Sequence, residues 1–316
     1  MFEFKFNIEE DEDSSINKSN EKTDASAQLQ WLPAKHHPLS LKHLKVLADG
    51  AIIEEVTVGK TKIKYISLSS VENIALKDSL STNISPAFKS HTDLVPAIYE
   101  GGLKIWECTW DLLKHLDSSN IDFTNCKILE LGCGAALPAI YTATYGAQIT
   151  IQDYNEEVID LVTAPNVILN LTNHDVGTIE GDNISKESSL EVNVPESILK
   201  EMATKASLYS GDWGSFNTMI SATSDKNKNS EEKFDLILSC ETIYNPDCHQ
   251  KLLNALTNNL KQTGTILLAA KNHYFGVGGG TQQFIDLVHK EGKLNVETHI
   301  TNSEGVKREI LEMHHK

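Results

Sequence analysis

The second half of the chain alternates short apolar runs with amphipathic segments. The apolar runs predict strands, and the segments between them repeat apolar residues at the three- to four-residue spacing that is typical of helices. The predicted strands lie at 127–131, 148–153, 207–213, 234–240, 263–271, 295–301 and 307–313, and the predicted helices at 106–116, 137–145, 156–170, 249–260 and 281–290. Pro165 is the expected break in the third helix, because proline has no N–H to donate.

Strands that alternate with helices predict an α/β fold, in which a doubly wound parallel sheet has helices on both faces. The run 234–240 is apolar enough for a central strand. The two strands that close the chain have no helix between them, so they predict one antiparallel edge strand. This pattern defines a domain over 91–316, and the polar stretch 175–205 within it is interpreted as an insertion.

The first ninety residues lack this alternation. Residues 1–35 are acidic and rich in polar residues, which predicts a flexible N-terminal segment, with a short strand or docking tail as the alternative. Residues 36–90 contain short apolar runs and predict an accessory region of small strands or helices, whose shape the sequence leaves open. The chain starts without a basic and apolar leader, so we expect no signal peptide.

The formal net charge of −16 disfavours direct nucleic-acid binding, which depends on basic groups. Acidity would attract a basic protein substrate, or it would serve solubility alone. Five cysteines without metal-binding spacing predict neither a disulfide framework nor a metal site. They fit a reducing compartment, and we expect the cytoplasm and nucleus. The uncharged stretch 131–152 contains glycines and a proline, and is interpreted as a buried loop, helix and strand rather than a membrane span.

A glycine-rich loop lies between the first strand of the domain and the helix after it. Gly132 and Gly134 allow the backbone to approach a ligand closely, and Asp153 ends the next strand, where a carboxylate can bind both ribose hydroxyls. The dinucleotide fingerprint needs a small residue where this loop has Leu137, so a dinucleotide fits badly. Glu130, two residues before the first glycine, is instead what adenosylmethionine loops carry. The sequence therefore predicts S-adenosylmethionine as the cofactor.

Six segments, in order along the chain, resemble those of the histidine protein methyltransferases, which are related to seven-strand enzymes that modify lysine. The segments are 101–109, 130–136, 152–155, 211–213, 241–246 and 273–280. The similarity covers about 90–315 and includes the short phenylalanine-rich start. It departs from the family at Ala136, where the family has a third glycine, and at 175–205, which has no family pattern.

The resemblance implies a seven-strand Rossmann-like sheet and a metal-free transfer of a methyl group to a histidine in another protein. The substrate that it implies is a large-subunit ribosomal protein, which we take to be ribosomal protein L3. The expected cofactor-binding residues are Trp106, Glu130, Gly132, Gly134, Asp153, Asp212 and Trp213, and the expected catalytic residues are Glu241, Tyr244 and His273.

Several of these roles have a plainer alternative. Asp153 could cap the next helix, and Trp106 and Trp213 could simply pack in the core. Asp212 is expected to accept the adenine amino group, with Trp213 over the ring. Glu241 is expected to hold one imidazole nitrogen so that the other faces the methyl group, with a surface salt bridge as its alternative. The glycine-rich loop 276–280 is interpreted as a substrate lip that closes.

A histidine substrate suits this chemistry, because a side chain with a pKa of about 6.5 is largely neutral at pH 7 and needs no strong base. A lysine must first lose a proton, since its pKa is about 10.4. Two alternatives stay open at this point. One is the same scaffold acting on lysine, and the other is a non-catalytic module that binds a ribosomal protein.

Overall fold

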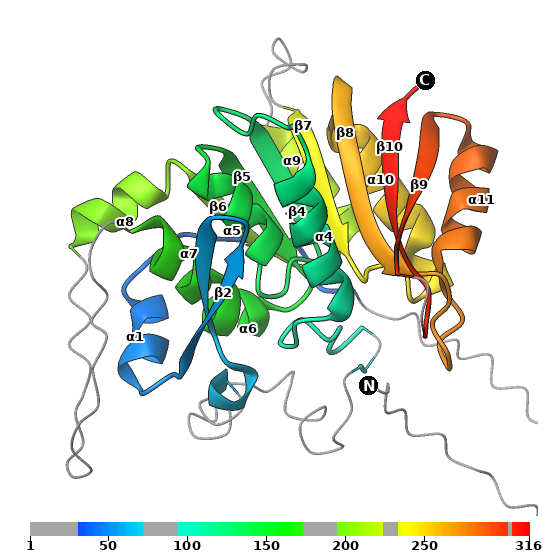
Figure 1. Cartoon of the computed structure of the whole chain (residues 1–316). Coiled ribbons are helices and arrows are strands. Elements are labelled where there is room, and N and C mark those ends of the chain that lie inside the picture. Colours follow the sequence, from blue (N-terminus) through cyan, green and yellow to red (C-terminus); the bar gives the residue numbers. More distant parts are fainter. Residues whose placement is uncertain (1–30, 72–93, 96, 173–194, 224–232, 303–304) are drawn as a thin grey trace, which may run out of the picture.

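The computed structural model describes residues 31–71, 94–95, 97–172, 195–223, 233–302 and 305–316 (Figure 1). Most of the expected N-terminal segment 1–35, the end of the accessory region 36–90 and most of the insertion 175–205 lie outside the described residues. Among the described residues, no helix has both the length and the apolar character that a membrane crossing requires.

Within the described residues, an eight-stranded sheet forms the centre of the molecule (Figure 1). Its order is β1-β6-β5-β4-β7-β8-β10-β9, and the five strands from β6 to β8 are parallel. The strands are β1 Lys35–His37, β4 Lys127–Leu131, β5 Gln148–Asp153, β6 Ala206–Ser210, β7 Phe234–Cys240, β8 Leu260–Lys271, β9 Leu294–Asn302 and β10 Arg308–His315. The predicted doubly wound sheet is therefore confirmed, with β1 as an addition at one edge.

The position of the antiparallel strand differs from the prediction. The strand β10 is antiparallel to both of its neighbours, but it lies between β8 and β9 rather than at the edge. The reason is apolar content, because β10 buries Ile310, Leu311 and Met313 whereas β9 is mostly polar and buries Leu294 alone among its residues. The more apolar of the two closing strands takes the interior position.

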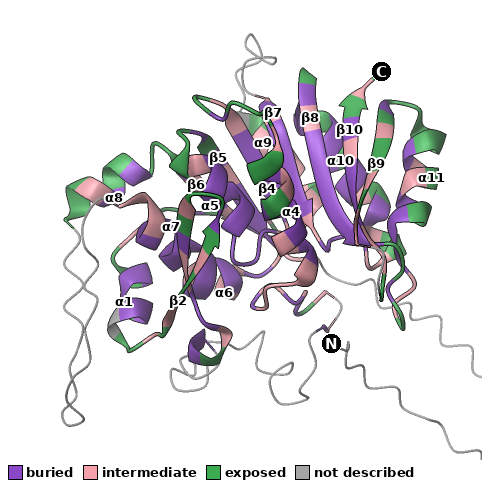
Figure 2. Ribbon diagram, viewed as in Figure 1, coloured by how far each residue is buried: buried purple, intermediate pink, exposed green. Residues whose placement is uncertain are grey.

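Helices cover both faces of the sheet, and each face has its own hydrophobic core (Figure 2). Successive strand residues alternate between the two, so that Ile128 packs in the core of α4, α5 and α7 whereas Leu129 packs in that of α9, α10 and α11. The helices are α1 Lys42–Ala48, α4 Glu107–Ser118, α5 Leu137–Thr144, α6 Glu156–Val158, α7 Ala164–Leu171, α8 Glu196–Met202, α9 Trp213–Thr223, α10 Pro246–Asn259 and α11 Thr281–Glu291.

Two segments differ in kind from the sequence prediction. The expected strand 207–213 ends at Ser210, and Trp213 begins the helix α9, which the pattern did not predict. Pro165 does not end its helix; instead, a π-helical turn, η1 Ile159–Thr163, joins α6 to α7 just before it. Pro165 has no N–H for the carbonyl of Leu161, and a wider turn accommodates that missing bond.

Within the accessory region, a two-stranded sheet of β2 Ile53–Val58 and β3 Thr61–Ile66 packs on α7. Asn170 binds both backbone groups of Lys64, and Asn166 accepts a hydrogen bond from the Ile66 amide. These side chains complete the outer edge of β3, so the small sheet is fixed to the large domain rather than tethered loosely beside it.

An ion-pair network around Asp160 holds β1 and α1 against the start of η1. The Asp160 carboxylate accepts hydrogen bonds from Lys42 Nζ at 2.7 Å and from His43 Nε2 at 3.1 Å, and lies 3.4 Å from His37 Nδ1. Although burial raises its pKa, these donors hold the pKa of Asp160 well below its usual value. Asp160, His37 and Glu156 come near enough to hold a metal ion, but Lys42 and Lys35 already pair with the two acids, which disfavours a second cation.

We expect Asp160→Asn to lower the free energy of unfolding by about 1.5 to 3 kcal/mol, the range for hydrogen bonds to a charged group. Because the folded-state pKa is depressed, the carboxylate stabilises the fold above about pH 4, and this contribution is lost as the pH falls further. Urea unfolding of both proteins at pH 7 and pH 3 measures this. Asp286→Asn, an exposed position on α11, is the matched control. Equal stability of the Asp160 variant and the unaltered chain at pH 7 would contradict the prediction.

Candidate functional site

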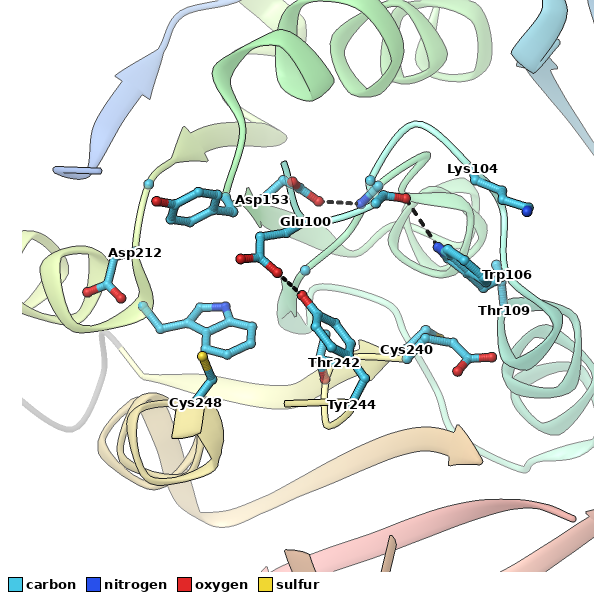
Figure 3. A pocket seen from close by; sticks show the side chains of 18 of the residues that line it. Glu100, Lys104, Trp106, Thr109, Asp153, Asp212, Cys240, Thr242, Tyr244 and Cys248 are labelled. Carbon is cyan, nitrogen blue, oxygen red and sulfur yellow. Dashed lines mark hydrogen bonds between the residues drawn. The ribbon is translucent and has the colours of Figure 1, made fainter. Parts of the chain in front are cut away.

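The carboxyl ends of β4 to β7 border a pocket with about 790 Å³ of space, its open mouth included (Figure 3). Ligands of doubly wound sheets bind at this edge, where the strand order reverses. The reversal falls at β4, which lies between β5 and β7. All the expected site residues line this pocket except Glu130 and His273.

The loop after β4 has a backbone that only small residues allow. Gly132 and Gly134 have φ angles of +65° and +50°. A Cβ on Gly132 would lie 2.4 Å from Cγ2 of Thr242, and one on Gly134 would lie 2.9 Å from the carbonyl oxygen of Gly102. Ala136 is also left-handed, with φ +57°, at the position before α5. The two glycines form a cradle that any side chain would fill.

The Asp153 carboxylate joins this loop to the end of β5. Its Oδ2 accepts a hydrogen bond from the Gly134 amide at 2.8 Å, and its Oδ1 accepts one from the Asn155 amide at 3.2 Å. A Cβ on Gly102 would lie 3.0 Å from both carboxylate oxygens, so this glycine keeps the carboxylate accessible from the pocket. Burial raises the pKa of Asp153 to about 6, against the effect of the backbone donors.

Glu130 lies beneath the loop rather than in the pocket wall. Its Oε2 accepts a hydrogen bond from the Ala139 amide at 2.8 Å, in the first turn of α5. Burial raises the pKa of Glu130 to about 8, so the free protein holds it largely protonated at pH 7. Glu130 thus connects the strand before the loop to the helix after it, and positions the loop between them.

Gln152 is a positioning residue that sequence reasoning missed. Its side chain accepts a hydrogen bond from the indole N–H of Trp213 at 2.9 Å and donates one to the Gly211 carbonyl at 2.7 Å. Trp213 is therefore held in the pocket wall by a specific bond rather than buried in the core. The available signal was a buried-strand position next to Asp153 that is polar although Ile149 and Ile151 earlier in the strand are apolar.

Asp212 has three protein partners at the adjoining wall. Its Oδ2 accepts hydrogen bonds from the Gly214 and Ser215 amides, which caps α9, and its Oδ1 forms a 2.8 Å ion pair with Lys251. A carboxylate oxygen accepts more than one hydrogen bond, so these contacts leave room for a ligand donor.

Trp106 forms another wall, directly before α4. Its indole N–H donates to the Gly101 carbonyl at 3.1 Å (Figure 3). The ammonium groups of Lys104 and Lys271 lie 4.8 and 5.7 Å from the centre of the ring. The ring therefore already faces positive charge, as a cation–π site does.

Glu241 follows β7 and is the most constrained acid in the pocket. It has a left-handed backbone with φ +56°, although it is not glycine, and its side chain is 4% exposed. Its Oε2 accepts a 2.5 Å hydrogen bond from the Tyr274 hydroxyl, whereas its Oε1 accepts a longer, 3.4 Å bond from the Cys108 amide and lies 3.8 Å from Lys271 Nζ. The Cys108 thiol also bonds to this carboxylate. Burial raises the pKa of Glu241, and Lys271 opposes that rise. Oε1 is the oxygen with capacity for another donor, and backbone strain of this kind is typical of functional positions.

Tyr244, an expected site residue, pairs with Glu100, which the sequence did not predict as one. The Tyr244 hydroxyl donates to Glu100 Oε2 (Figure 3). The Ala97 amide donates to Oε1 of the same carboxyl group at 2.7 Å. Burial raises the pKa of both side chains. Glu100 directly precedes the Gly101–Gly102 run, but nothing in the local pattern distinguishes it from a surface glutamate.

His273 lies outside this group. It is exposed, does not line the pocket, and its ring packs edge-on against Phe275 at 4.7 Å. The following loop reaches the site through Gly279, whose amide donates to the Tyr244 carbonyl at 2.9 Å. A Cβ on Gly279 would lie 2.3 Å from that carbonyl oxygen, so this contact needs glycine. The expected lip is thus attached to Tyr244 in this structure.

The charge of the pocket discriminates between ligands. Among the described residues, its wall contains four carboxyl groups and one lysine; the acids are Glu100, Asp153, Asp212 and Glu241. Such a wall repels the pyrophosphate of a dinucleotide and attracts a cationic ligand. The acid surplus and the glycine cradle therefore fit a sulfonium nucleoside such as S-adenosylmethionine.

Similarity to known proteins agrees with this chemistry. The chain is 37% identical to the histidine protein methyltransferase 1 homolog of Rattus norvegicus, over 89% of this chain and 74% of that protein. Its identity to the Bos taurus homolog is 38%, over 89% and 72%. A protein N-lysine methyltransferase of Mus musculus is 25% identical over 54% of this chain and 61% of its own length.

Other comparisons add less. No protein-family model matches the chain. A solved magnesium protoporphyrin IX methyltransferase from Synechocystis covers 78% of this chain and 97% of its own with a TM-score of 0.43 and 11% identity, too distant to bear on function. The two mammalian relatives align over nearly the whole chain, and we conclude that the protein belongs to the histidine protein methyltransferase family, with S-adenosylmethionine as its methyl donor.

Proposed function

We propose that this protein methylates one imidazole nitrogen of a histidine in ribosomal protein L3, in the cytoplasm and nucleus. The observation that carries the proposal is the position of Glu241, a buried carboxylate whose Oε1 has longer contacts than its Oε2, in the wall of the pocket that contains the glycine cradle and Asp153. The rat and cattle relatives, which are named for histidine methylation, support the choice of nucleophile. The net charge of −16 favours a basic protein such as a ribosomal protein.

The chain's own residues divide the work of the reaction. When bound, S-adenosylmethionine supplies the electrophilic methyl carbon. Asp153 would bind the ribose hydroxyls, and Gly132 and Gly134 would let the cofactor approach the backbone closely. Trp106 would present its ring to the positive charge of the sulfonium group. Glu130 and Gln152 would act beneath them by fixing the loop and the Trp213 ring.

Glu241 would orient the substrate imidazole. Its Oε1 would accept the N–H of one ring nitrogen, which fixes the tautomer and turns the lone pair of the other nitrogen toward the methyl donor. Tyr274 holds the second oxygen in place, and Lys271 favours the ionised form. After transfer the ring would carry an extra positive charge, and Oε1 would accept the surplus proton. Tyr244, held by Glu100, would close the pocket beside the ring and exclude water.

The direct test is methyl transfer from isotope-labelled S-adenosylmethionine to purified ribosomal protein L3, followed by acid hydrolysis of the product. We expect the label in methylhistidine. Replacing the target histidine with alanine should remove it. Label in methyllysine would contradict the proposal, and absence of label in L3 alongside label in another ribosomal protein would contradict the substrate.

The cofactor site can be tested without turnover. We expect S-adenosylhomocysteine, but not NAD, to raise the melting temperature. Asp153→Ala should weaken S-adenosylhomocysteine binding by about 1.5 to 3 kcal/mol, because ligand hydroxyls lose a charged partner. Affinity should fall as the pH drops below about 6, where Asp153 becomes protonated, and Asp153→Asn should flatten that dependence. Calorimetric titration with Asp286→Ala as the control measures both, and an unchanged affinity in the alanine variant would remove Asp153 from the site.

The role of Glu241 predicts a difference between two substitutions. Glu241→Gln keeps an oxygen acceptor and should slow single-turnover methyl transfer by roughly 10- to 1000-fold. Glu241→Ala should be slower still if hydrogen bonding dominates, whereas equal rates would indicate that proton uptake matters more. Cofactor affinity should stay near that of the unaltered chain, and Glu291→Gln on the surface of α11 is the control. Unchanged rates in both Glu241 variants would exclude the residue from the reaction.

The acidity of the chain predicts a salt effect on substrate capture. The screening length falls from about 30 Å at 0.01 M salt to about 8 Å at 0.15 M. We therefore expect the association rate with the basic substrate to fall by about tenfold or more from 0.01 to 0.15 M salt, and to fall further at higher salt. The single-turnover rate of the preformed complex should change little. A stopped-flow association rate that is independent of salt would show that the acidity serves solubility alone.

A further inference from the structure

The segment just before β1 forms part of the pocket, although the sequence pattern predicted a flexible extension there. It crosses the ends of β5 and β6: the Asp212 amide donates to the Leu32 carbonyl at 2.9 Å, and the Leu32 amide donates to the Tyr154 hydroxyl at 3.3 Å. The Ala34 amide donates to the Ser215 hydroxyl at 2.7 Å. We call residues 31–37, which include β1, the N-terminal strap.

Close packing fixes where the strap runs. A Cβ on Gly211 would lie 2.4 Å from the Pro33 carbonyl oxygen and 2.7 Å from Cα of Ala34. Beyond this contact, β1 pairs with β6 from Lys35 to His37. The strap is therefore held along its length by the strand edge and by the start of α9.

Trp31 is the residue that the strap contributes to the pocket. Its ring meets the Tyr154 ring edge-on, with centroids 6.1 Å apart, and Lys251 Nζ lies 3.7 Å from the ring centre. The same ammonium group pairs with Asp212. Trp31 thus belongs to the wall beyond Asp153, together with Tyr154 and Asp212, and the Lys251 contact sets the face that the ring presents.

We propose that Trp31 is a cofactor-binding residue, which supplies an aromatic wall for the adenine ring of S-adenosylmethionine. The inference rests on the proposed cofactor site, in which Asp153 binds the ribose. The base must extend from the ribose toward the wall that contains Tyr154 and Asp212, and Trp31 is a large aromatic surface at that wall, in addition to Tyr154 and to Trp213, which follows Asp212. Base–aromatic stacking contributes about 1 to 3 kcal/mol per base in other proteins, enough to decide the affinity of a nucleoside.

The test uses the full chain and calorimetric titration with S-adenosylhomocysteine. Trp31→Ala should weaken binding by about 5- to 150-fold, which corresponds to the loss of one stacked base. Trp31→Phe keeps an aromatic face and should stay within about fivefold of the unaltered chain. His36→Ala is the matched control on the same strap, because its exposed side chain packs on Tyr209 outside the pocket. Its affinity should be unchanged.

Fluorescence gives a second readout that a merely structural role would not produce. The chain has four tryptophans, and adenine stacked on Trp31 should quench its emission. We expect Trp31→Phe to remove part of the change induced by S-adenosylhomocysteine while binding persists. Trp31→Ala affinity equal to that of the unaltered chain would overturn the proposal, and so would an equal loss in Trp31→Ala and His36→Ala. If the unaltered chain itself does not bind S-adenosylhomocysteine, the proposed cofactor site is wrong. If it binds and Trp31→Ala binds equally well, the cofactor site stands and only the role of Trp31 is wrong.

Discussion

The shape of the site depends on the hydrogen bond that the Gly134 amide donates to Asp153. It joins the loop after β4 to the end of β5, and it is available because the two strands pair in parallel with Leu131 opposite Gln152. A second bond, from the Cys133 amide to the Gln152 carbonyl, continues this pairing into the loop. A one-residue slip of β5 would turn Asp153 to the opposite face of the sheet. Register, set by the two cores, therefore decides whether a cofactor site exists at all.

Burying several carboxyl groups at one edge is costly, and each of them is compensated in its own way. Asp153 has backbone donors, Glu130 is held largely protonated, and Glu241 has Tyr274 and Lys271. The raised pKa values show that compensation is incomplete. Groups whose pKa is shifted by burial concentrate at functional sites. Carboxyl groups that are arranged to bind a cationic ligand lack full compensation before the ligand binds, and this lowers the stability of the free protein.

The N-terminal region supports the site from outside. The Asp160 network fixes α1 and β1 against η1, and β1 in turn places the strap along β6. The β2–β3 sheet binds α7 through Asn166 and Asn170, and α7 ends the helical segment that follows Asp153 at the end of β5. What reads as an accessory region in the sequence is thus attached to the elements that border the pocket. Its contribution to ligand binding comes through position, except at Trp31, which lines the pocket itself.

The sequence by itself determined the parallel sheet, the bounds of β4, β5 and β7, and the placement of Gly132, Gly134 and Asp153 at one edge. Apolar runs that end in glycine or a carboxylate fix these features locally, without reference to the rest of the chain.

Only the tertiary structure decided the rest. It put β10 between β8 and β9, since the order of the two closing strands depends on which of them buries more apolar surface. It brought Trp31, Glu100 and Gln152 into the site and left His273 on the surface, and such assignments depend on contacts between segments far apart in the chain. A side chain's local pattern gives its face on a strand or helix, but its partners follow from how those elements pack.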